Sequence, residues 1–180
     1  MIERTTRQAV LPYLPCRLLS LGYPDGLTQD DLAGSDVTVV DVIAHRGTET
    51  LADLNAPHEF GTFDLVLDPG TCEHCANPGQ AWRTAIEAVA LYGHLVQTAP
   101  LTMLNHGFWN YCPQVIREVY QANGLTLQRC EVYTLDHQPV RHGPLYARTT
   151  TLPDNCWALV VGERHERVSW TWPRQGCYAC

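Results

Sequence analysis

Lysine is absent from this chain of 180 residues, and arginine supplies all 12 basic side chains. Against 19 acidic residues this leaves a formal net charge of −7. Because the arginines are scattered along the sequence, no basic patch that would bind a nucleic-acid backbone is predicted. Nucleic acid is therefore not expected as a partner.

Long apolar runs are also missing. No segment approaches the roughly 20 apolar residues that a membrane-spanning helix needs. The N-terminal sequence MIERTTRQAVLPYLP lacks the unbroken apolar core of a secretory signal. These absences predict a cytoplasmic protein without a membrane partner.

The remaining composition is that of an ordinary globular protein. Hydrophobic residues make up 45% of the chain and charged residues 17%. A chain of this length buries about two-thirds of its unfolded surface. Since no internal repeat, low-complexity tract or linker divides the sequence, we expect one domain over residues 1–180, with its core at about 17–162 and an extension at each end.

Short apolar runs alternate with polar loops and helical segments along the chain. The predicted strands are residues 17–22, 37–42, 50–54, 63–68 and 95–99, and the predicted helices are about 77–92 and 113–123. Two longer strands, 125–135 and 156–162, follow as an antiparallel pair. The predicted fold class is α/β, with a mostly parallel sheet flanked by helices and a C-terminal antiparallel strand pair.

Ionisable side chains gather directly after the predicted strand at 63–68, where Asp68, Glu73 and His74 follow one another closely. Ligands of open α/β sheets bind beyond the carboxyl ends of the strands. A histidine beside a carboxylate can transfer a proton near neutral pH. The alternative is structural, because Glu73 and His74 could instead cap or brace the helix that follows.

A polar and aromatic segment, TMLNHGFWNY, follows the next predicted strand. Asn105, His106, Trp109 and Tyr111 combine hydrogen-bonding groups with flat apolar faces, a mixture typical of small-molecule pockets. A loop of this length is more often functional than a plain connection. The alternative is an aromatic patch packed on the core.

The order of these signals resembles that of the class I S-adenosylmethionine-dependent methyltransferases, over about residues 17–162. That family has a turn of the form D/E-x-G-x-G-x-G after its first strand, and the matching segment here is SLGYPDG. Gly22 and Gly26 keep the outer glycines, whereas Ser20 and Pro24 replace the acid and the middle glycine. The resemblance implies a Rossmann-like sheet in which Gly22 and Gly26 let the backbone approach S-adenosylmethionine.

The resemblance also implies roles for the acids and the polar loops. Asp41, which ends the second strand, would bind the ribose hydroxyls, and Asp53 would lie near the adenine. The groups that would orient or deprotonate the acceptor are Asp68, His74 and His106, and those that would bind it are Glu73, Asn105, Trp109 and Tyr111.

The function implied in this way is S-adenosylmethionine-dependent methyl transfer to a small-molecule acceptor. The alternative is a catalytically inactive module that serves in binding or assembly. Ser20 offers no negative charge to the ammonium group of the cofactor, and Pro24 removes a backbone donor. The connection from Asp41 to Asp53 is also too short for a normal helical crossover between parallel strands.

Eight cysteines are many for a cytosolic chain. Buried thiols explain them better than a disulfide framework does, because no secretory signal is seen. Two C-x-x-C pairs, Cys72/Cys75 and Cys177/Cys180, could hold Zn²⁺ between four thiolates if the tail folded back. Glu73 and His74 fit the methyltransferase pattern without a metal, so we expect no metal ligands and keep a zinc-stapled scaffold as the alternative.

Overall fold

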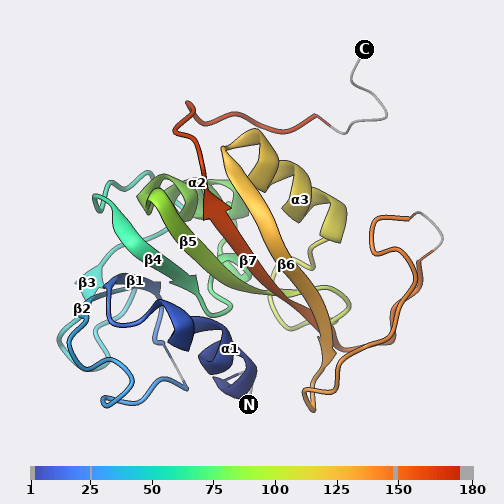
Figure 1. Ribbon diagram of the computed structural model, residues 1–180, viewed down its shortest axis with the longest axis horizontal. Helices are drawn as coiled ribbons and strands as arrows, with labels where there is room; N and C mark the ends of the chain where they lie inside the picture. Colours follow the sequence, from blue (N-terminus) through green and yellow to red (C-terminus); the bar gives the residue numbers. More distant parts are fainter. Residues whose placement is uncertain (1–2, 25, 148–149, 175–180) are drawn as a thin grey trace.

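A computed structural model describes residues 3–24, 26–147 and 150–174 (Figure 1). The strands of these residues form one sheet in the order β3-β2-β1-β4-β5-β7-β6. They are β1 (Arg17–Leu21), β2 (Asp36–Asp41), β3 (Thr50–Leu51), β4 (Phe63–Asp68), β5 (Val89–Pro100), β6 (Leu125–Thr134) and β7 (Cys156–Arg164). Of these strands, β7 alone runs in the opposite direction to the others, and it pairs with β5 and β6 in antiparallel fashion. The predicted α/β class with a mostly parallel sheet and an antiparallel C-terminal pair is therefore confirmed.

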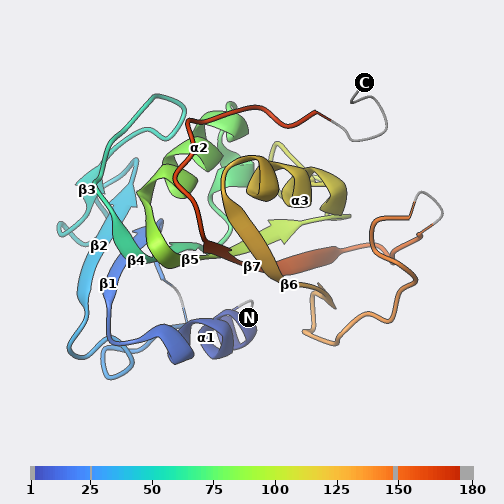
Figure 2. The same ribbon diagram turned by 45° about the horizontal axis from the view of Figure 1, so that its top comes forward.

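Helices cover both faces of the sheet (Figure 2). The helices α2 (Pro78–Ala88) and α3 (Pro113–Ala122) lie on one face, and α1 (Glu3–Val10) lies on the other. Short 3-10 helices, η1 (Leu11–Tyr13) and η2 (Cys72–His74), follow α1 and β4. No helix within the described part of the chain combines the length and the apolar character needed to cross a membrane.

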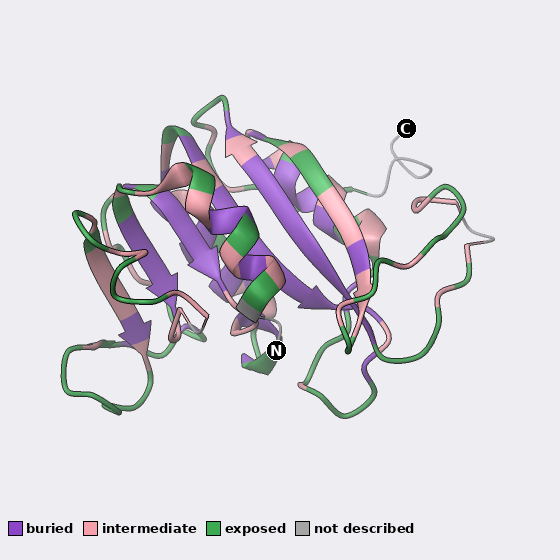
Figure 3. Ribbon diagram, turned by 60° about the horizontal axis from the view of Figure 1, so that its bottom comes forward, coloured by how far each residue is buried: buried purple, intermediate pink, exposed green. Residues whose placement is uncertain are grey.

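The central strands are buried along almost their whole length (Figure 3). Because successive strand residues face opposite sides, Leu18 and Leu65 pack in the cluster with α1, whereas Leu19 and Val66 pack in the cluster with α2 and α3. Burial on both faces explains why these strands read as continuous apolar runs rather than alternating ones.

The helix α2 ends at Ala88, earlier than the sequence predicted, and a distant side chain binds the carbonyl groups at this end. The guanidinium of Arg164, from β7, donates to the carbonyl oxygens of Ile86 at 2.8 Å and Val89 at 3.0 Å. The chain then enters β5 directly at Val89, so that strand begins six residues before the predicted start at 95.

The connections from β2 to β3 and from β3 to β4 are loops without a helix. Residues 42–49 join β2 to β3, which is only Thr50–Leu51, and residues 52–62 join β3 to β4 without a helix. The predicted third strand at 50–54 was therefore too long. The short loops leave the carboxyl ends of β1, β2 and β3 open.

Candidate functional site

A cavity of about 440 Å³ lies at the carboxyl ends of β1, β2, β3 and β4. It is lined by Gly22 after β1, residues 40–42 at the end of β2, residues 52–55 after β3, and Gly70, Thr71, His74 and Cys75 after β4. This is the crevice in which open α/β sheets bind ligands.

The turn after β1 meets the loop after β4 at the floor of the cavity. Gly22 has a φ of +83°, and its N–H donates to the carbonyl oxygen of Val40 at 2.7 Å. The hydroxyl of Thr71 donates to the carbonyl oxygen of Leu21. Ser20 is buried and donates to the carbonyl oxygen of Gly22, so its side chain supports the turn from below.

Gly22, Asp41 and Asp53, three of the predicted cofactor-binding residues, line the same cavity, and Gly26 is not in its lining. The Asp41 carboxylate accepts from the backbone N–H of Ile43 at 3.2 Å. The backbone and side-chain amides of Asn55 donate to Asp53 at 2.9 and 2.7 Å, and they lower the pKa of that carboxyl. Two carboxylates facing one cavity can accept hydrogen bonds from hydroxyl and amino groups.

Asp68 is fully buried and is not in the lining of this cavity. Its Oδ1 accepts from the backbone N–H of Thr71 at 2.7 Å and more distantly from those of Gly70 and Cys72. Its Oδ2 accepts from the side-chain amide of Gln97 at 2.8 Å. We expected this carboxylate to face the acceptor, but its position suits it to hold the loop that forms the cavity floor.

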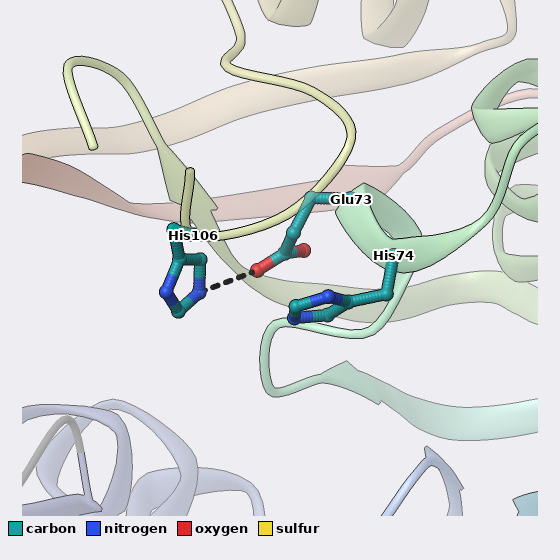
Figure 4. A group of neighbouring side chains, drawn as sticks. All are labelled: Glu73, His74 and His106. Atoms are coloured by element: carbon teal, nitrogen blue, oxygen red, sulfur yellow. Dashed lines mark ion pairs between the residues drawn. The ribbon is translucent and has the colours of Figure 1, made fainter. Parts of the chain in front are cut away.

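Glu73, His74 and His106 lie together (Figure 4), and His74 also lines the cavity. Glu73 and His74 belong to η2, whereas His106 comes from the loop after β5. Glu73 Oε1 is 3.5 Å from His106 Nε2, and the two imidazole rings are 5.3 Å apart.

The surroundings of this cluster favour neutral forms. Burial, reinforced by the negative charge of Asp68, raises the pKa of Glu73 to about 8. Partial burial and the neighbouring His74 lower the pKa of His106. Both shifts weaken the ion pair that Glu73 and His106 could form at 3.5 Å.

A second hollow of about 360 Å³ shares His74 with the cavity and is lined by His74, Asn105, His106, Gly107 and Phe108. The Phe108 side chain is 72% exposed, although its N–H donates to the carbonyl oxygen of Glu73 at 2.9 Å. Phe108 was not singled out from the sequence. Its place in the segment TMLNHGFWNY was the available signal, since an exposed aromatic side chain beside a hollow can cover a ligand.

The other two aromatic residues of this loop lie outside the second hollow. Trp109 donates from Nε1 to the carbonyl oxygen of Cys75 at 3.0 Å. Tyr111 is buried with its ring 4.7 Å from that of Trp82. The structural alternative, packing on the core, therefore describes Tyr111, and Trp109 serves to hold the loop in place.

The six cysteines that the structure describes are free thiols. Burial raises the pKa of Cys75 to about 11 and that of Cys72 well above its ordinary value. Both side chains are thus poor sources of thiolate. The partner pair of the zinc alternative, Cys177 and Cys180, lies outside the described residues.

No protein-family model matches the chain, and no curated protein matches its sequence. Its fold is similar to that of the N-methyltransferase NodS from Bradyrhizobium japonicum, solved with S-adenosylhomocysteine, at a TM-score of 0.64 and 17% identity over 92% of this chain and 88% of NodS. The fold is also similar to that of the 1,6-didemethyltoxoflavin-N1-methyltransferase of Burkholderia thailandensis, solved with S-adenosylhomocysteine. The TM-score is 0.63 and the identity 14%, over 92% of this chain and 79% of that enzyme.

TehB from Haemophilus influenzae gives a TM-score of 0.59 at 13% identity over 89% of this chain. The chain spans only 61% of the length of TehB. These likenesses confirm the Rossmann-like fold of the class I S-adenosylmethionine-dependent methyltransferases, which the resemblance of the sequence implied.

Proposed function

We propose that the protein is an S-adenosylmethionine-dependent methyltransferase acting on a small-molecule acceptor. The observation that carries this proposal is the convergence of Gly22, Asp41 and Asp53, from three strand ends, on one cavity. The complexes of NodS and of the Burkholderia N1-methyltransferase with S-adenosylhomocysteine support it, because the fold is shared.

In this proposal the nucleoside of the cofactor occupies the cavity at the ends of β1, β2 and β3. Asp41 accepts hydrogen bonds from the ribose hydroxyls, and Asp53 accepts from the adenine end. Gly22 carries no side chain, which lets the cofactor approach the backbone closely. Gly26 has no part in the contact, since it is not in the lining.

The acceptor would occupy the second hollow, which adjoins the cavity at His74. Its volume of about 360 Å³ lies in the range of small-molecule sites. Methyl transfer depends on aligning the acceptor atom with the donor carbon, so groups that position the acceptor matter most. His74, Asn105 and His106 border the hollow and would orient the acceptor, while Phe108 would cover it.

Replacing Asp41 by alanine tests the cofactor site. We expect the affinity for S-adenosylmethionine and S-adenosylhomocysteine to fall about 10–100-fold, since a hydrogen bond to a charged group contributes about 1.5–3 kcal/mol. Isothermal titration calorimetry measures the change. Stability should be nearly unchanged, because Asp41 lies at a strand end and its carboxylate accepts a local hydrogen bond from the N–H of Ile43.

The matched control is Asp36→Ala, at the other end of the same strand β2, where the carboxylate is well exposed. This variant should bind both nucleosides like the wild type. Equal affinity in Asp41→Ala and wild type would contradict the proposed cofactor site.

A binding or assembly module without catalysis is the second candidate. The observation that favours it is the use of Ser20 to support Gly22, which leaves no acid at the position where the resembling family has one. Folded wild-type protein that gives no heat with either nucleoside at millimolar concentration would favour this module and contradict the enzyme.

A further inference from the structure

Glu73, His74 and His106 bring together three side chains of the types that bind metal ions. One carboxylate oxygen and one nitrogen from each imidazole all lie within 4.8 Å of one another. Figure 4 shows the three side chains lying close to one another, two from η2 and one from the loop after β5.

The Glu73 carboxyl is buried there without the hydrogen bonds that would offset its burial. The residue is 2% exposed, and its Oε2 accepts no hydrogen bond from any residue that the structure describes. An unsatisfied buried polar group costs about 1–3 kcal/mol. Such a group in a native fold calls for an explanation, and an ion held at this carboxyl supplies one.

The backbone around Glu73 is shaped to keep the side chain in this position. A Cβ at Gly70 would lie 2.9 Å from Glu73 Oε1, and a Cβ at Gly107 would lie 3.0 Å from the Glu73 carbonyl oxygen and 3.1 Å from its Cγ. The N–H of Phe108 donates to that carbonyl oxygen. The two glycines therefore leave room for the Glu73 side chain, and the hydrogen bond from Phe108 ties the backbone of Glu73 to the loop that carries His106.

We propose that Glu73, His74 and His106 bind a divalent transition-metal ion at the edge of the second hollow. Two histidines and one glutamate form a known three-ligand set for Zn²⁺ that leaves at least one coordination position open. Imidazole nitrogen favours Zn²⁺ and its first-row neighbours over Mg²⁺, which prefers oxygen ligands. From the sequence we expected no metal ligands, because Glu73 and His74 fit the methyltransferase pattern without a metal.

Binding needs the side chains to draw together. Bonds from zinc to nitrogen or oxygen are about 2.0–2.2 Å long, which places the ligand atoms of a tetrahedral site roughly 3.4 Å apart, so atoms that now lie up to 4.8 Å apart must move closer. His74 and His106 are exposed and can turn toward the buried carboxylate. The open position of the ion then faces the hollow with Asn105 and Phe108.

An ion at this position would hold an acceptor by an oxygen or nitrogen donor atom. This use of the ion rests on the proposed function, because it presumes that the second hollow receives the acceptor. Binding of the ion itself does not depend on it.

Titration of the whole metal-free chain with Zn²⁺ by calorimetry tests the site, with Mg²⁺ as the contrasting ion. We expect about one Zn²⁺ per chain and far weaker binding of Mg²⁺. Glu73→Gln and His106→Ala should each weaken Zn²⁺ binding more than about tenfold, because even an outer-shell partner of a metal commonly contributes a factor of about 10–100. Glu73→Gln conserves the size of the side chain, and His106 is exposed, so both variants should fold.

Two control variants separate this site from other donors. His165→Ala removes a histidine that lies 3.6 Å from Glu163 but belongs to no three-ligand group among the described residues, and Zn²⁺ affinity should not change. The double variant Cys177→Ser/Cys180→Ser removes the tail thiols, and affinity should again be retained. If the cysteine variant lost Zn²⁺ binding and His106→Ala retained it, the ion would be bound by the tail thiols and the proposal would be overturned. Absence of Zn²⁺ binding in the wild type would overturn it as well.

Failure of this proposal and failure of the proposed function give different results. Asp41→Ala should lose affinity for S-adenosylhomocysteine but keep Zn²⁺, whereas His106→Ala should lose Zn²⁺ but keep the nucleoside. Wild-type protein that binds Zn²⁺ and no nucleoside would retain the metal site and contradict the methyltransferase. The reverse pattern would retain the methyltransferase and contradict the metal site.

Discussion

Asp68→Ala is expected to destabilise the protein by about 3–5 kcal/mol, because several buried donors lose their partner at once. The carboxylate accepts from the backbone of Thr71 and from the side chain of Gln97, and it lies fully inside the protein. For a chain of this size the loss corresponds to a fall in Tm of about 6–20 °C. Thermal unfolding followed by circular dichroism measures it.

Asp68→Asn is the matched control for this prediction. The remaining oxygen of the substituted side chain can still accept from Thr71, and the amide of Gln97 can turn so that its oxygen accepts from the new amide. Tyr120, whose hydroxyl donates to Gln97 in the wild type, can then accept from it instead. Asp68→Asn should therefore lose less than half as much stability. If Asp68→Ala lost less than about 1 kcal/mol, the size of a single ordinary hydrogen bond, Asp68 would not be what holds the loop.

Gly22→Ala should lower stability by about 2–5 kcal/mol and weaken nucleoside binding together with it. A left-handed conformation costs a residue with a Cβ about 1–2 kcal/mol, and the φ of Gly22 is +83°. The added Cβ would also lie 2.6 Å from Thr71 Oγ1, and such overpacking typically costs about 1–3 kcal/mol more. Denaturant unfolding and titration with S-adenosylhomocysteine measure the two effects.

Gly61→Ala separates these two causes. Gly61 has the same φ of +83°, but no heavy atom among the described residues lies within 4 Å of a Cβ added there. It should therefore show the backbone cost alone, about 1–2 kcal/mol. Combining Gly22→Ala with Thr71→Ala removes the clashing oxygen and should bring the loss close to that of Gly61→Ala. Equal losses in the two single glycine variants would mean that Thr71 moves aside without cost.

The local signals in the sequence predicted most of the secondary structure. Asn77, at the predicted start of the helix, caps α2 by accepting from the backbone N–H of Gln80 at 3.2 Å, and Pro78 follows it in the first turn. Gly124, with a φ of +78°, follows the end of α3, where a glycine commonly adopts this left-handed conformation. These features depend on a few neighbouring residues, so the sequence contains them. The N-terminal helix α1 was not predicted, although its residues pack on the sheet.

The sequence also indicated the edge of the sheet at which the candidate site lies, but not the different surroundings of its residues. Asp41 and Asp53 lie at the ends of neighbouring parallel strands, and the carboxyl ends of such strands lie at one edge of the sheet. Asp68 and Glu73 are only five residues apart, yet their surroundings differ. Both carboxylate oxygens of Asp68 accept hydrogen bonds. Glu73 lies beside His106 and has one oxygen without a partner among the described residues.

Apolar periodicity, capping residues and glycines at turns thus determined the order of the elements and the edge of the sheet at which a ligand can bind. Tertiary structure alone decided that Arg164 binds the carbonyl groups at the end of α2 and which acid meets His106. The physical reason is the distance along the chain over which each effect acts. Backbone preferences depend on residues that are close in the sequence. Burial, hydrogen-bond partners and pKa shifts depend instead on residues that only the folded chain brings together.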